Sequence, residues 1–531
     1  MKTGPTTWSK GGVAAAIFAV SFVVYLATLA PTITWRHEGA DSAELIAASY
    51  TLGIAHPPGY PTYVLLGKAF SSLVPLGEVA YRFNLMSALF AAATVALVFL
   101  IVLRLLRLFS PPEPGRQKVA RLVAAGVAAL TLAFSPVFWS QAIIAEVHAL
   151  HAFFMALTIY LLLRWLQPSG APAAKPGLCG NAALWAASFV YALSLGNHLI
   201  GLLIAPALLF LAVRRGRPSA ATLLGAALFF ALGLSVYLFL PWRAAQHPLI
   251  NWGDPQTMPR FLWLVSGAPY RQFLFSLPLS YLPARLGAWS SLALGQFTPV
   301  GIALGVVGLW YCWRRHLDFA IFSAASFVLV SAYAIGYNTT DSYIYLIPAF
   351  LLFSVWLGVG IYYLIGELAC PWLAAKGRLA WARLTPALAL FLLLIPAFSL
   401  YGSYDLLDLS HDREAYLYAE AAFKAVEPNA VIIADTDRHI FPLWYFRYVA
   451  DQNSEVIVLA KPLLGYQWYR DEARLRHPGL VISSDIDDYR RQTLAIIEAN
   501  RGKRPIYSSE ASPDPGMRYL AVGPLFRLLP E

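Results

Sequence analysis

Two acidic residues three positions apart stand near the start of the chain. Asp41 and Glu44 occur in Asp41-Ser-Ala-Glu44, and His56 follows in His56-Pro-Pro-Gly-Tyr-Pro61. A carboxylate can act as a general base that takes the proton of an attacking hydroxyl group. The same spacing is typical of a helix N-terminus, with Asp41 as the N-cap and Glu44 at the third helical position, and the histidine turn can be a plain rigid linker. Catalysis and capping are compatible, so both interpretations stay open.

Arginine and histidine residues recur around these acids. Guanidinium groups bind a phosphate through paired N–H donors, so carboxylates and arginines together suit transfer of a sugar from a lipid phosphate to a hydroxyl. Arg243 follows a long apolar run, where an arginine can also simply extend its charged end to the membrane surface. The candidate catalytic residues are Asp41 and Glu44. The candidate donor-binding or acceptor-binding residues are Arg36, His37, His56, Tyr60, Arg82, Asn84, Glu146, His148, Asn197, His198, Arg243, Trp252, Asp254 and Asp341.

Several of these candidates also have structural interpretations. Glu146 precedes an apolar run, where the dipole of the following helix favours an acidic side chain. Gly196-Asn197-His198 joins two short apolar runs and can be a hydrogen-bonded hairpin inside the membrane boundary. Asp341, in Asn338-Thr-Thr-Asp341, can be a helix cap. The sequence has no His-x-x-x-His motif or cysteine pair, so it predicts no histidine or cysteine metal site. A site formed by carboxylates alone is the remaining way to bind a divalent cation as a cofactor.

The composition places most of the chain in a membrane. The 531 residues are 58% hydrophobic and 13% charged, with a mean hydropathy of +0.58, whereas soluble proteins carry about 25% charged residues. About eleven apolar runs are long enough to cross a hydrocarbon layer of ~30 Å. They lie near 11–31, 84–103, 122–139, 146–165, 178–196, 199–213, 221–240, 286–312, 319–337, 345–366 and 384–401.

The charges divide the chain into two parts. After Tyr401 lie 19 of the 29 acidic and 15 of the 39 basic residues, so the first part has a net charge of +14 and the second of −4. We expect an all-α polytopic membrane domain, residues 1–401, with outer loops 32–83 and 241–285, and a small extracytoplasmic α/β domain, residues 402–531. Basic clusters on alternate connections predict a cytoplasmic N-terminus and an external tail. The positive charge therefore belongs to loops beside a bilayer and gives no support to nucleic-acid binding.

Seven of the ten acidic residues in the membrane part fall at the predicted outer face. Carboxylates are costly near lipid, so this distribution predicts an ionisable outer rim over an apolar bundle. Residues 44–53 and 62–73 have the apolar spacing of short helices on the membrane surface, separated by a proline-rigid turn. The seven outer acids are Glu38, Asp41, Glu44, Glu78, Glu146, Asp254 and Asp341.

The tail alternates helical stretches with short β-type runs such as Val431-Ile-Ile-Ala434, a pattern typical of a small α/β domain. Asp435-Thr-Asp437 follows this run and resembles the Asp-x-Asp motif of nucleotide-sugar glycosyltransferases. Nucleotide sugars are not expected outside the membrane, so we favour a strand end followed by a helix cap. The tail is then expected to be a lid or an acceptor platform.

Six motifs in order resemble those of a known family. They are Ala30-Pro-Thr-Ile-Thr, Asp41-Ser-Ala-Glu44-Leu-Ile, His56-Pro-Pro-Gly-Tyr-Pro61, Asn84-Leu-Met-Ser87, Phe138-Trp-Ser-Gln-Ala and Glu146-Val-His148. Together they resemble glycosyltransferase family 117, a former domain of unknown function similar to the transmembrane protein O-mannosyltransferases of animals. The resemblance covers about residues 28–200, continues weakly through 242–255 and 337–345, and does not reach the tail.

The resemblance implies a GT-C fold, a catalytic acid in the first outer loop, a polyprenyl-phosphate sugar donor and an inverting transfer. Asp41 matches the lead acid of that loop and Glu44 its companion. We therefore expect an enzyme that moves a sugar, mannose in the first instance, to a protein Ser/Thr or glycan hydroxyl, with Arg243 and Arg36 or Arg82 stabilising the departing phosphate. The compact chain suggests a bacterial inner membrane and undecaprenyl phosphate. The alternatives are a multi-span transporter or lipid-linked sugar flippase, and a non-catalytic assembly factor.

Overall fold

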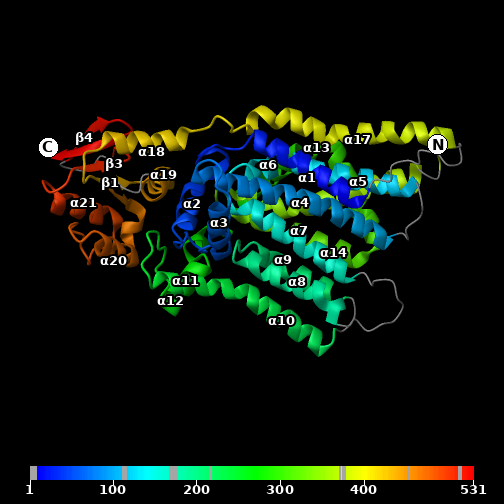
Figure 1. The fold of residues 1–531 in the computed structure, drawn as a ribbon, viewed down its shortest axis with the longest axis horizontal. Coiled ribbons are helices and arrows are strands. Elements are labelled where there is room, and N and C mark those ends of the chain that lie inside the picture. The colour runs from blue at the N-terminus through cyan, green and yellow to red at the C-terminus, as the bar shows by residue number, and fades with distance from the viewer. Residues whose placement is uncertain are drawn as a thin grey trace.

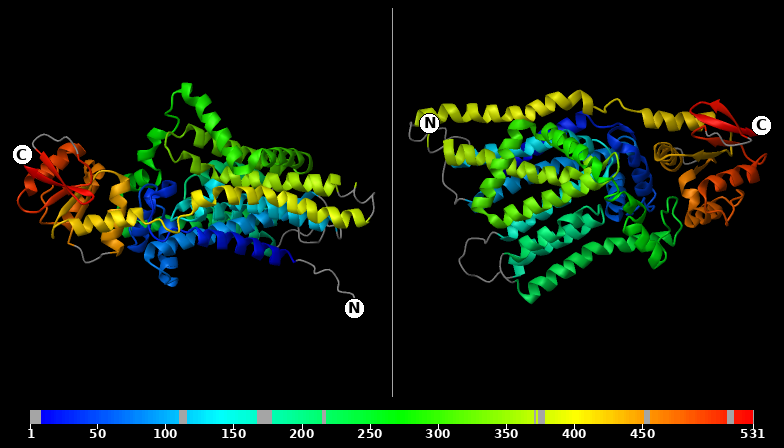
Figure 2. Two further views of the ribbon diagram at one scale, coloured as in Figure 1. Left: turned by 90° about the horizontal axis from the view of Figure 1, so that it is seen from above. Right: turned by 180° about the vertical axis from the view of Figure 1, so that it is seen from behind.

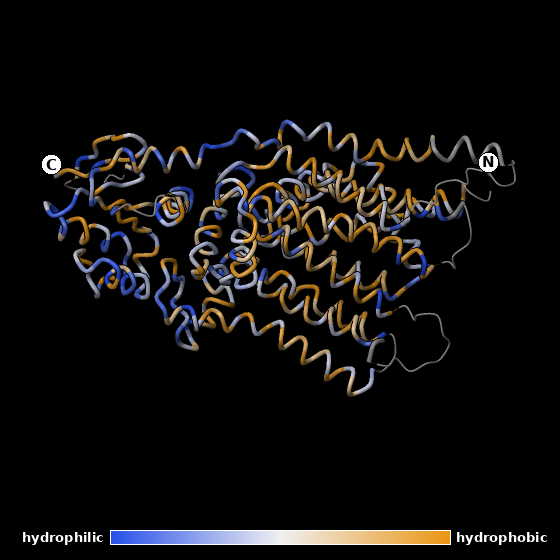
Figure 3. Tube along the Cα trace, viewed as in Figure 1, coloured by the Kyte–Doolittle hydropathy of each residue, from blue (hydrophilic) through white to orange (hydrophobic). Residues whose placement is uncertain are grey.

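The computed structural model describes residues 9–109, 116–166, 178–214, 218–369, 372, 378–450, 455–511 and 517–530. A bundle of long helices makes up most of the molecule, and an α/β domain lies beyond one end of it (Figure 1). The short helices of the outer loops lie between the two parts, as Figure 2 shows from two further sides. The bundle is mostly hydrophobic along its length, whereas hydrophilic segments gather in the α/β domain and the outer loops (Figure 3).

Within the described residues, eight helical segments are long and apolar enough to cross a membrane. A ninth candidate, Lys118–Ala133 with Pro136–Ala142, is bent by 67°, and two shorter apolar helices are Asn181–Leu195 and Gly201–Val213. The eleven predicted apolar runs coincide with these segments, so the all-α membrane fold is confirmed. The eight long segments are Lys10–Ala27, Val79–Phe109, Val147–Leu166, Ala220–Ala244, Leu279–Arg315, Leu317–Gly336, Ser342–Ala369 and Ala387–Leu407.

The bundle packs closely where glycines face each other. A Cβ atom at Gly308 or Gly360 would collide with the backbone carbonyl of Trp356 or Leu304, so two helices touch through their backbones there. The bundle helices are α1 (Lys10–Ala27), α4 (Val79–Phe109), α5 (Arg116–Ala133), α6 (Pro136–Ala142), α7 (Val147–Leu166), α8 (Leu178–Leu195), α9 (Gly201–Val213), α10 (Ala220–Leu234), α13 (Leu282–Arg315), α14 (Leu317–Gly336), α15 (Ile347–Tyr362), the π-helix η6 (Tyr363–Ala369) and α17 (Arg378–Leu407).

The outer loops contain the short helices that position the candidate site. As expected, the first loop forms two of them, α2 (Ser42–Tyr50) and α3 (Pro61–Leu73). Pro61 stands at the first position of α3, where its fixed φ favours helix initiation. The other outer elements are η1 (Arg36–Asp41), η2 (Ser235–Leu238), α11 (Phe239–Ala244), α12 (Met258–Val265), η3 (Ala268–Phe273), η4 (Leu279–Tyr281) and η5 (Ser342–Leu346).

The α/β domain, or soluble part, follows α17 (Arg378–Leu407). It is built around a five-stranded sheet of order β2-β1-β3-β5-β4. β1 (Val431–Ala434) pairs in parallel with β2 (Ile457–Ala460) and β3 (Ile506–Ser508), and β5 (Leu525–Pro530) pairs antiparallel with β3 and with β4 (Met517–Val522). The α/β prediction is thus confirmed. The remaining elements are α18 (Glu414–Ala425), α19 (Asp437–Tyr445), η7 (Phe446–Ala450), η8 (Lys461–Gly465), α20 (Gln467–Arg476) and α21 (Tyr489–Asn500).

The soluble part shares a core with the outer loops. One cluster of buried apolar side chains runs from α2 and α3 into α19 and β1, and includes Ile46, Tyr63, Leu443 and Ile432. α17 continues to Leu407, past residue 401, and leads directly into this region along one edge of the molecule (Figure 1). The shared core fixes the soluble part against the adjoining end of the bundle.

Candidate active site

The first outer loop bends sharply just before Asp41. His37 and Glu38 have positive φ angles of 58° and 60° within η1, a backbone conformation that residues with a side chain adopt rarely. The side-chain amide of Gln141 donates a hydrogen bond to the carbonyl of His37 at 3.0 Å. This bond ties the bend to α6 and helps to set the direction in which α2 begins.

Asp41 is the N-cap residue of α2, but its carboxylate makes no capping hydrogen bond. Its Oδ2 atom instead lies 3.7 Å from Nε2 of His56. The Asp41 side chain is 45% exposed, so a substrate can reach it. Helix capping therefore does not explain where this carboxylate points.

Glu44 is buried and is bound twice by His56. The Nδ1 atom of His56 lies 3.0 Å from Oε2 of Glu44, and the backbone N–H of His56 donates to Oε1 at 3.0 Å. The exposed fraction of the Glu44 side chain is 0%, so a substrate does not touch it in this conformation. Glu44 orients His56, which presents its other ring nitrogen to Asp41.

The two carboxylates control the charge of His56. Burial opposes protonation of its ring, but the charges of Glu44 and Asp41 outweigh burial and raise the pKa of His56 to about 9. His56 is therefore a cation at neutral pH. Partial burial raises the pKa of Asp41, the His56 charge opposes that rise, and Glu44 adds to it. A carboxylate with a raised pKa is a stronger base toward a hydroxyl group.

Further carboxylates approach Asp41 from other segments. The hydroxyl of Ser42 donates to Oε1 of Glu146 at 3.4 Å, and burial followed by the charge of Asp41 raises the pKa of Glu146. Burial and the charge of Asp341 raise the pKa of Glu38, and Asp341 also contributes to the raised pKa of Asp41. The structure thus brings together acids that are more than a hundred residues apart in the sequence.

Aromatic side chains surround His56. Its ring centroid lies 5.0 Å from that of Tyr60, 6.1 Å from that of Trp252 and 6.4 Å from that of Tyr270, all in edge-on arrangements. Tyr60 and Trp252 were candidates from the sequence, whereas Tyr270 was not. Tyr270 belongs to η3 in the second outer loop, and no motif in the sequence marks it.

A series of aromatic rings continues from Tyr60 into the end of the bundle next to the outer loops. The ring centroid of His198 lies 6.3 Å from that of Tyr60 and 5.3 Å from that of His148. The ring of Tyr345 follows at 6.0 Å from His148, and its hydroxyl donates to Asp341 at 3.2 Å. His148 and His198 therefore lie within the same polar region as the carboxylates.

Two candidate asparagines hold the backbone of this region in place. The side-chain amide of Asn84 donates to the carbonyls of Ala30 and Thr32 at 2.7 and 3.0 Å. The amide of Asn197 donates to the carbonyl of Val147 at 2.9 Å. The first asparagine anchors the start of the first outer loop, and the second anchors the Gly196 hairpin to the start of α7.

Arg243 lies at the far end of α2 from Asp41. Its guanidinium donates to the carbonyls of Leu52 and Thr51 at 2.5 and 3.2 Å and to the side chain of Gln246 at 2.6 Å. All three of its nitrogens therefore have protein acceptors. A phosphate-binding role for Arg243 remains a prediction.

The other two candidate arginines also have protein partners. Arg82 donates to the carbonyls of Ser71 and Gly77 at 3.0 and 3.2 Å. Arg36 is exposed and lies 3.6 Å from the carboxylate of Glu414 in the soluble part. The neighbouring His37 is partly buried, and burial and then the charge of Arg36 lower its pKa to about 4.

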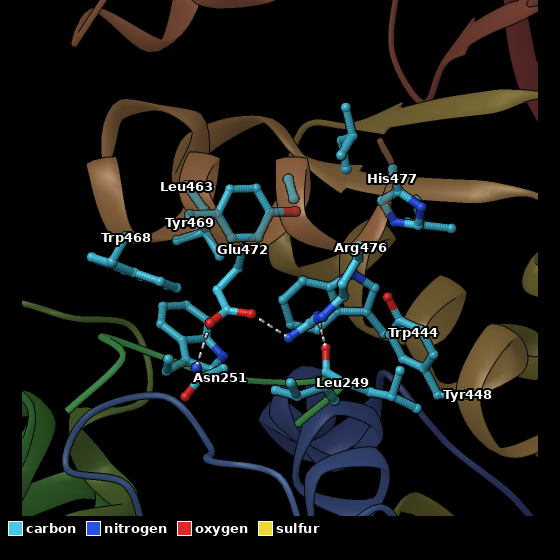
Figure 4. A pocket seen from close by; sticks show the side chains of 15 residues that line it. Leu249, Asn251, Trp444, Tyr448, Leu463, Trp468, Tyr469, Glu472, Arg476 and His477 are labelled. Atoms are coloured by element: carbon cyan, nitrogen blue, oxygen red, sulfur yellow. Dashed lines mark hydrogen bonds and ion pairs between the residues drawn. The ribbon is translucent and has the colours of Figure 1, made fainter. Parts of the chain in front are cut away.

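The second outer loop is fastened to the soluble part by Glu472. The carboxylate of Glu472 accepts hydrogen bonds from Asn251 at 2.9 Å and Arg476 at 3.0 Å (Figure 4). It also lies 2.7 Å from Nδ1 of His247. Asn251 also donates to the candidate residue Asp254 at 3.3 Å. Asp254 is paired with Arg260 in the same loop, so Asp254 belongs to this fastening and not to the cluster around Asp41.

A small cavity lies beside this fastening. Trp252, Trp444 and Trp468 line it, and the side-chain N–H group of each is buried without a hydrogen-bond partner among the described residues. The cavity has a volume of about 30 Å³, which is room for about one or two water molecules. It is too small for a sugar.

A larger cavity of about 250 Å³ opens between α13, α14 and η5. Its walls are mostly apolar, with Arg285 and Trp289 among the lining residues. Arg285 donates through Nε to the carbonyl of Ile335 at 3.1 Å. Through Nη2 it donates to the carbonyls of Ala334 and Tyr337 at 3.0 and 2.7 Å and to the hydroxyl of Ser342 at 2.8 Å. Its Nη1 has no acceptor among the described residues. Ser342 directly follows Asp341, so this cavity borders the carboxylate cluster.

The soluble part supplies one more carboxylate to the site. α19 packs on η1 and α2, and the charges of Asp41 and His56 act on Asp437 at its first position. Asp435 is separate from the site, because it binds Lys461 and two serine hydroxyls within the soluble part. The sequence motif drew attention to this pair of acids but gave no sign that Asp437 faces the membrane domain.

The chain is similar in sequence to known proteins. The family model of the N-terminal domain of Protein O-mannosyl-transferase TMEM260 matches residues 41–222. Protein O-mannosyl-transferase TMEM260 of Mus musculus is 26% identical over 521 residues, which cover 91% of this chain and 67% of that protein. The corresponding protein of Dictyostelium discoideum is 22% identical over 538 residues, covering 92% of this chain and 62% of that protein. The chain thus spans about two thirds of the length of these relatives.

A solved structure shares the fold over almost the whole chain. The crystal structure of ArnT from Cupriavidus metallidurans bound to undecaprenyl phosphate matches with a TM-score of 0.57 over 98% of both chains, at 14% sequence identity. At this identity the likeness shows the fold, while the sequence relatives carry the activity class. Together these similarities show a multi-pass membrane glycosyltransferase with a GT-C fold that is similar to the protein O-mannosyltransferases.

Proposed function

We propose that the chain transfers mannose from a polyprenyl-phosphate donor to a hydroxyl group of a protein Ser or Thr, with inversion at the sugar C1. The observation that carries the proposal is Asp41, an accessible carboxylate without a capping bond that faces the cationic ring of His56. The similarity to protein O-mannosyltransferases supports mannose and a protein acceptor. The undecaprenyl phosphate bound to the ArnT neighbour supports a polyprenyl-phosphate donor.

In this reaction Asp41 accepts the proton of the acceptor hydroxyl while the hydroxyl oxygen attacks C1. The bond between C1 and the phosphate oxygen breaks on the opposite face, so the anomeric configuration inverts, as in other one-step carboxylate-assisted displacements. The bonding electrons leave with the polyprenyl phosphate. The positive charge of His56 keeps Asp41 ionised before the attack, and Glu44 keeps His56 in place.

The departing phosphate gains negative charge and needs a donor group near it. We assign this role to Arg285, because its cavity is apolar, borders Asp341 and opens between bundle helices, where an isoprenoid chain can enter from the bilayer. Arg243 remains the alternative predicted from the sequence, although its nitrogens already bind Leu52, Thr51 and Gln246. We further propose that the site faces the outside of a bacterial inner membrane, with the N-terminus in the cytoplasm.

The test uses the purified chain in lipid nanodiscs with radiolabelled polyprenyl-phosphate mannose and a secreted-protein extract. Wild-type protein should label protein acceptors, and Asp41→Asn should not. Asp471→Asn is a matched control, because Asp471 has a similar exposed fraction of 44% but lies on α20 in the soluble part. Absence of protein labelling by wild type, with donor and extract shown to be competent with another enzyme, would refute the proposed reaction.

A further inference from the structure

The N-terminus of α19 is fastened to the first outer loop. The indole N–H of Trp35 donates to the carbonyl of Arg438 at 2.9 Å, and the Arg438 guanidinium lies 4.4 Å from the centre of the Trp35 ring. Trp35 also contacts Tyr418 of α18, with ring centroids 5.4 Å apart. Trp35 immediately precedes η1, so these contacts hold the start of α19 against the turn that delivers Asp41.

Asp437 stands at this start, and nothing in the soluble part uses its carboxylate. Thr436 and not Asp437 is the N-cap residue of α19, and the Asp437 carboxylate forms no hydrogen bond or ion pair with any described residue. The side chain remains exposed. Asp435, two residues earlier, is bound by Lys461, Ser508 and Ser509, so the two acids of the motif have different surroundings.

Although Asp437 contacts solvent, the protein around it shifts the pKa of its carboxyl group. Burial and the negative charge of Asp41 raise the pKa of Asp437 to about 6, and the positive charge of His56 opposes the rise. Tyr270 of the second outer loop is influenced by both Asp41 and Asp437. Because α19 packs on η1 and α2, the exposed acid at its first position lies on the boundary of the same polar site.

The direction from which Asp437 approaches indicates what it binds. The polyprenyl chain of the donor must remain in the bilayer, whereas α19 belongs to the domain beyond the end of the bundle (Figure 2). A carboxylate without protein partners is a strong acceptor for the N–H or O–H groups of a polar ligand. Such groups are abundant on the backbone and hydroxyl side chains of a peptide.

We propose that Asp437 is an acceptor-binding residue, which binds an N–H or O–H group of the acceptor peptide from the aqueous side and orients the attacking hydroxyl toward Asp41. This inference rests on the proposed function. It makes the soluble part a component of the active site, and it makes α19 the element through which that part influences the choice of acceptor.

The experiment measures transfer to a synthetic Ser/Thr peptide as a function of peptide and donor concentration. Asp437→Asn keeps the shape of the side chain and removes its charge. It should raise the KM for the peptide by about tenfold, the size expected for a lost charge-assisted hydrogen bond, and leave the KM for the donor unchanged. Asp437→Glu should recover part of the loss, and Asp471→Asn should have no effect. Equal thermal melting of all variants establishes that they fold.

The pH profile provides a second readout that a structural role would not change. The ionised Asp437 disfavours a second negative charge on Asp41, so its removal should shift the acidic limb of kcat/KM to lower pH. The charged or titratable groups on the elements around Asp437 include Arg36, His37, Glu38, Asp41, Glu44, His56, Tyr270, Arg438 and His439. None of these groups is altered in Asp437→Asn, so a shift reports the lost charge.

The outcomes separate this inference from the proposed function. If wild type transfers mannose to the peptide but Asp437→Asn has an unchanged peptide KM and pH profile, the inference is wrong and the proposed function stands. A rise in the donor KM alone would also overturn it, because Asp437 would then lie on the donor side. If wild type transfers no sugar to any peptide, both fail together.

Discussion

His56 binds Glu44 through two nitrogens, with the ring Nδ1 at 3.0 Å and the backbone N–H at 3.0 Å from the two carboxylate oxygens. Because Glu44 is 0% exposed while Asp41 is 45% exposed, the two acids of the motif have different tasks. Glu44 fixes the ring, and we propose that Asp41 meets the substrate. The His56 ring therefore couples the position of Glu44 to that of Asp41.

Asp41→Asn should reduce kcat by a factor on the order of 10²–10⁴, as expected for the loss of a general base. Folding should be little affected, because the Asp41 side chain caps no helix and forms a single long contact with His56. Initial rates of transfer and thermal melting of the same preparations measure the two effects. An Asp41→Asn enzyme as active as Asp471→Asn would show that another group removes the proton.

Glu44→Gln should shift the basic limb of the activity profile to lower pH. Loss of the buried negative charge lowers the pKa of His56 from about 9, so the ring becomes neutral at a lower pH and no longer offsets the charge of Asp41. The amide can still accept the backbone N–H of His56, so the loop should stay folded. Rates between pH 6 and 10 test this expectation, and an unchanged basic limb would contradict the role of the Glu44 charge.

His56 should make stability depend on pH in a defined direction. Its pKa is higher in the folded protein, about 9, than the ordinary 6.5, so the folded state binds its proton more tightly. The stabilisation is complete below about pH 6.5 and is lost as the pH rises through 9, with a total on the order of 3 kcal/mol. Melting temperatures in detergent should therefore fall between pH 7 and 10, and less so in His56→Gln. Parallel curves for the two proteins would refute this linkage.

Arg285→Ala should impair use of the donor more than Arg243→Ala does. Arg285 borders the apolar cavity next to Asp341, and loss of a group that stabilises the departing phosphate should lower kcat by about 10²-fold or more. Arg243→Ala should act mainly on stability, because it removes the partners of Thr51 and Leu52. Donor titrations and melting curves of both variants decide between them. A donor defect confined to Arg243→Ala would return the phosphate to the second outer loop.

Glu472→Gln should loosen the soluble part from the second outer loop. The buried carboxylate has partners in His247, Asn251 and Arg476, and removal of its charge should cost about 1–3 kcal/mol. Hydrogen exchange should increase in residues 247–252 and in α20. Glu498, in α21 and outside this fastening, is a suitable control as Glu498→Gln. Unchanged exchange in residues 247–252 would show that the apolar contacts alone hold the two parts together.

The helical architecture was predictable because long apolar runs report directly on membrane spans. The bend between α5 and α6 was hidden, since Pro136 interrupts a run that is apolar on both sides. The first outer loop was also predictable, because Asp41, Glu44 and His56 are close in sequence and the turn between α2 and α3 is short. The contact of His56 with both acids follows from this proximity.

The rest of the site depends on contacts between distant segments, which no local pattern reveals. Tyr270 and Asp437 reach Asp41 only through the packing of the second outer loop and α19. The sequence also could not show that all three nitrogens of Arg243 have protein acceptors. Nor could it show that Arg285, which no sequence motif marks, has acceptors on Nε and Nη2 and none on Nη1 among the described residues. Residue type predicts the chemistry available to a side chain. Contacts with neighbouring residues determine which of its polar atoms are free to bind a ligand.

The left-handed residues His37 and Glu38 determine when the energetic cost of arranging the site arises. Each such residue costs about 1–3 kcal/mol, and the conformation persists only where the surrounding structure determines it. The bond from Gln141 to the His37 carbonyl is part of that structure, so the cost is met once, during folding. Asp41 is therefore already aimed before any sugar arrives, and substrate binding energy is not needed to rearrange this turn.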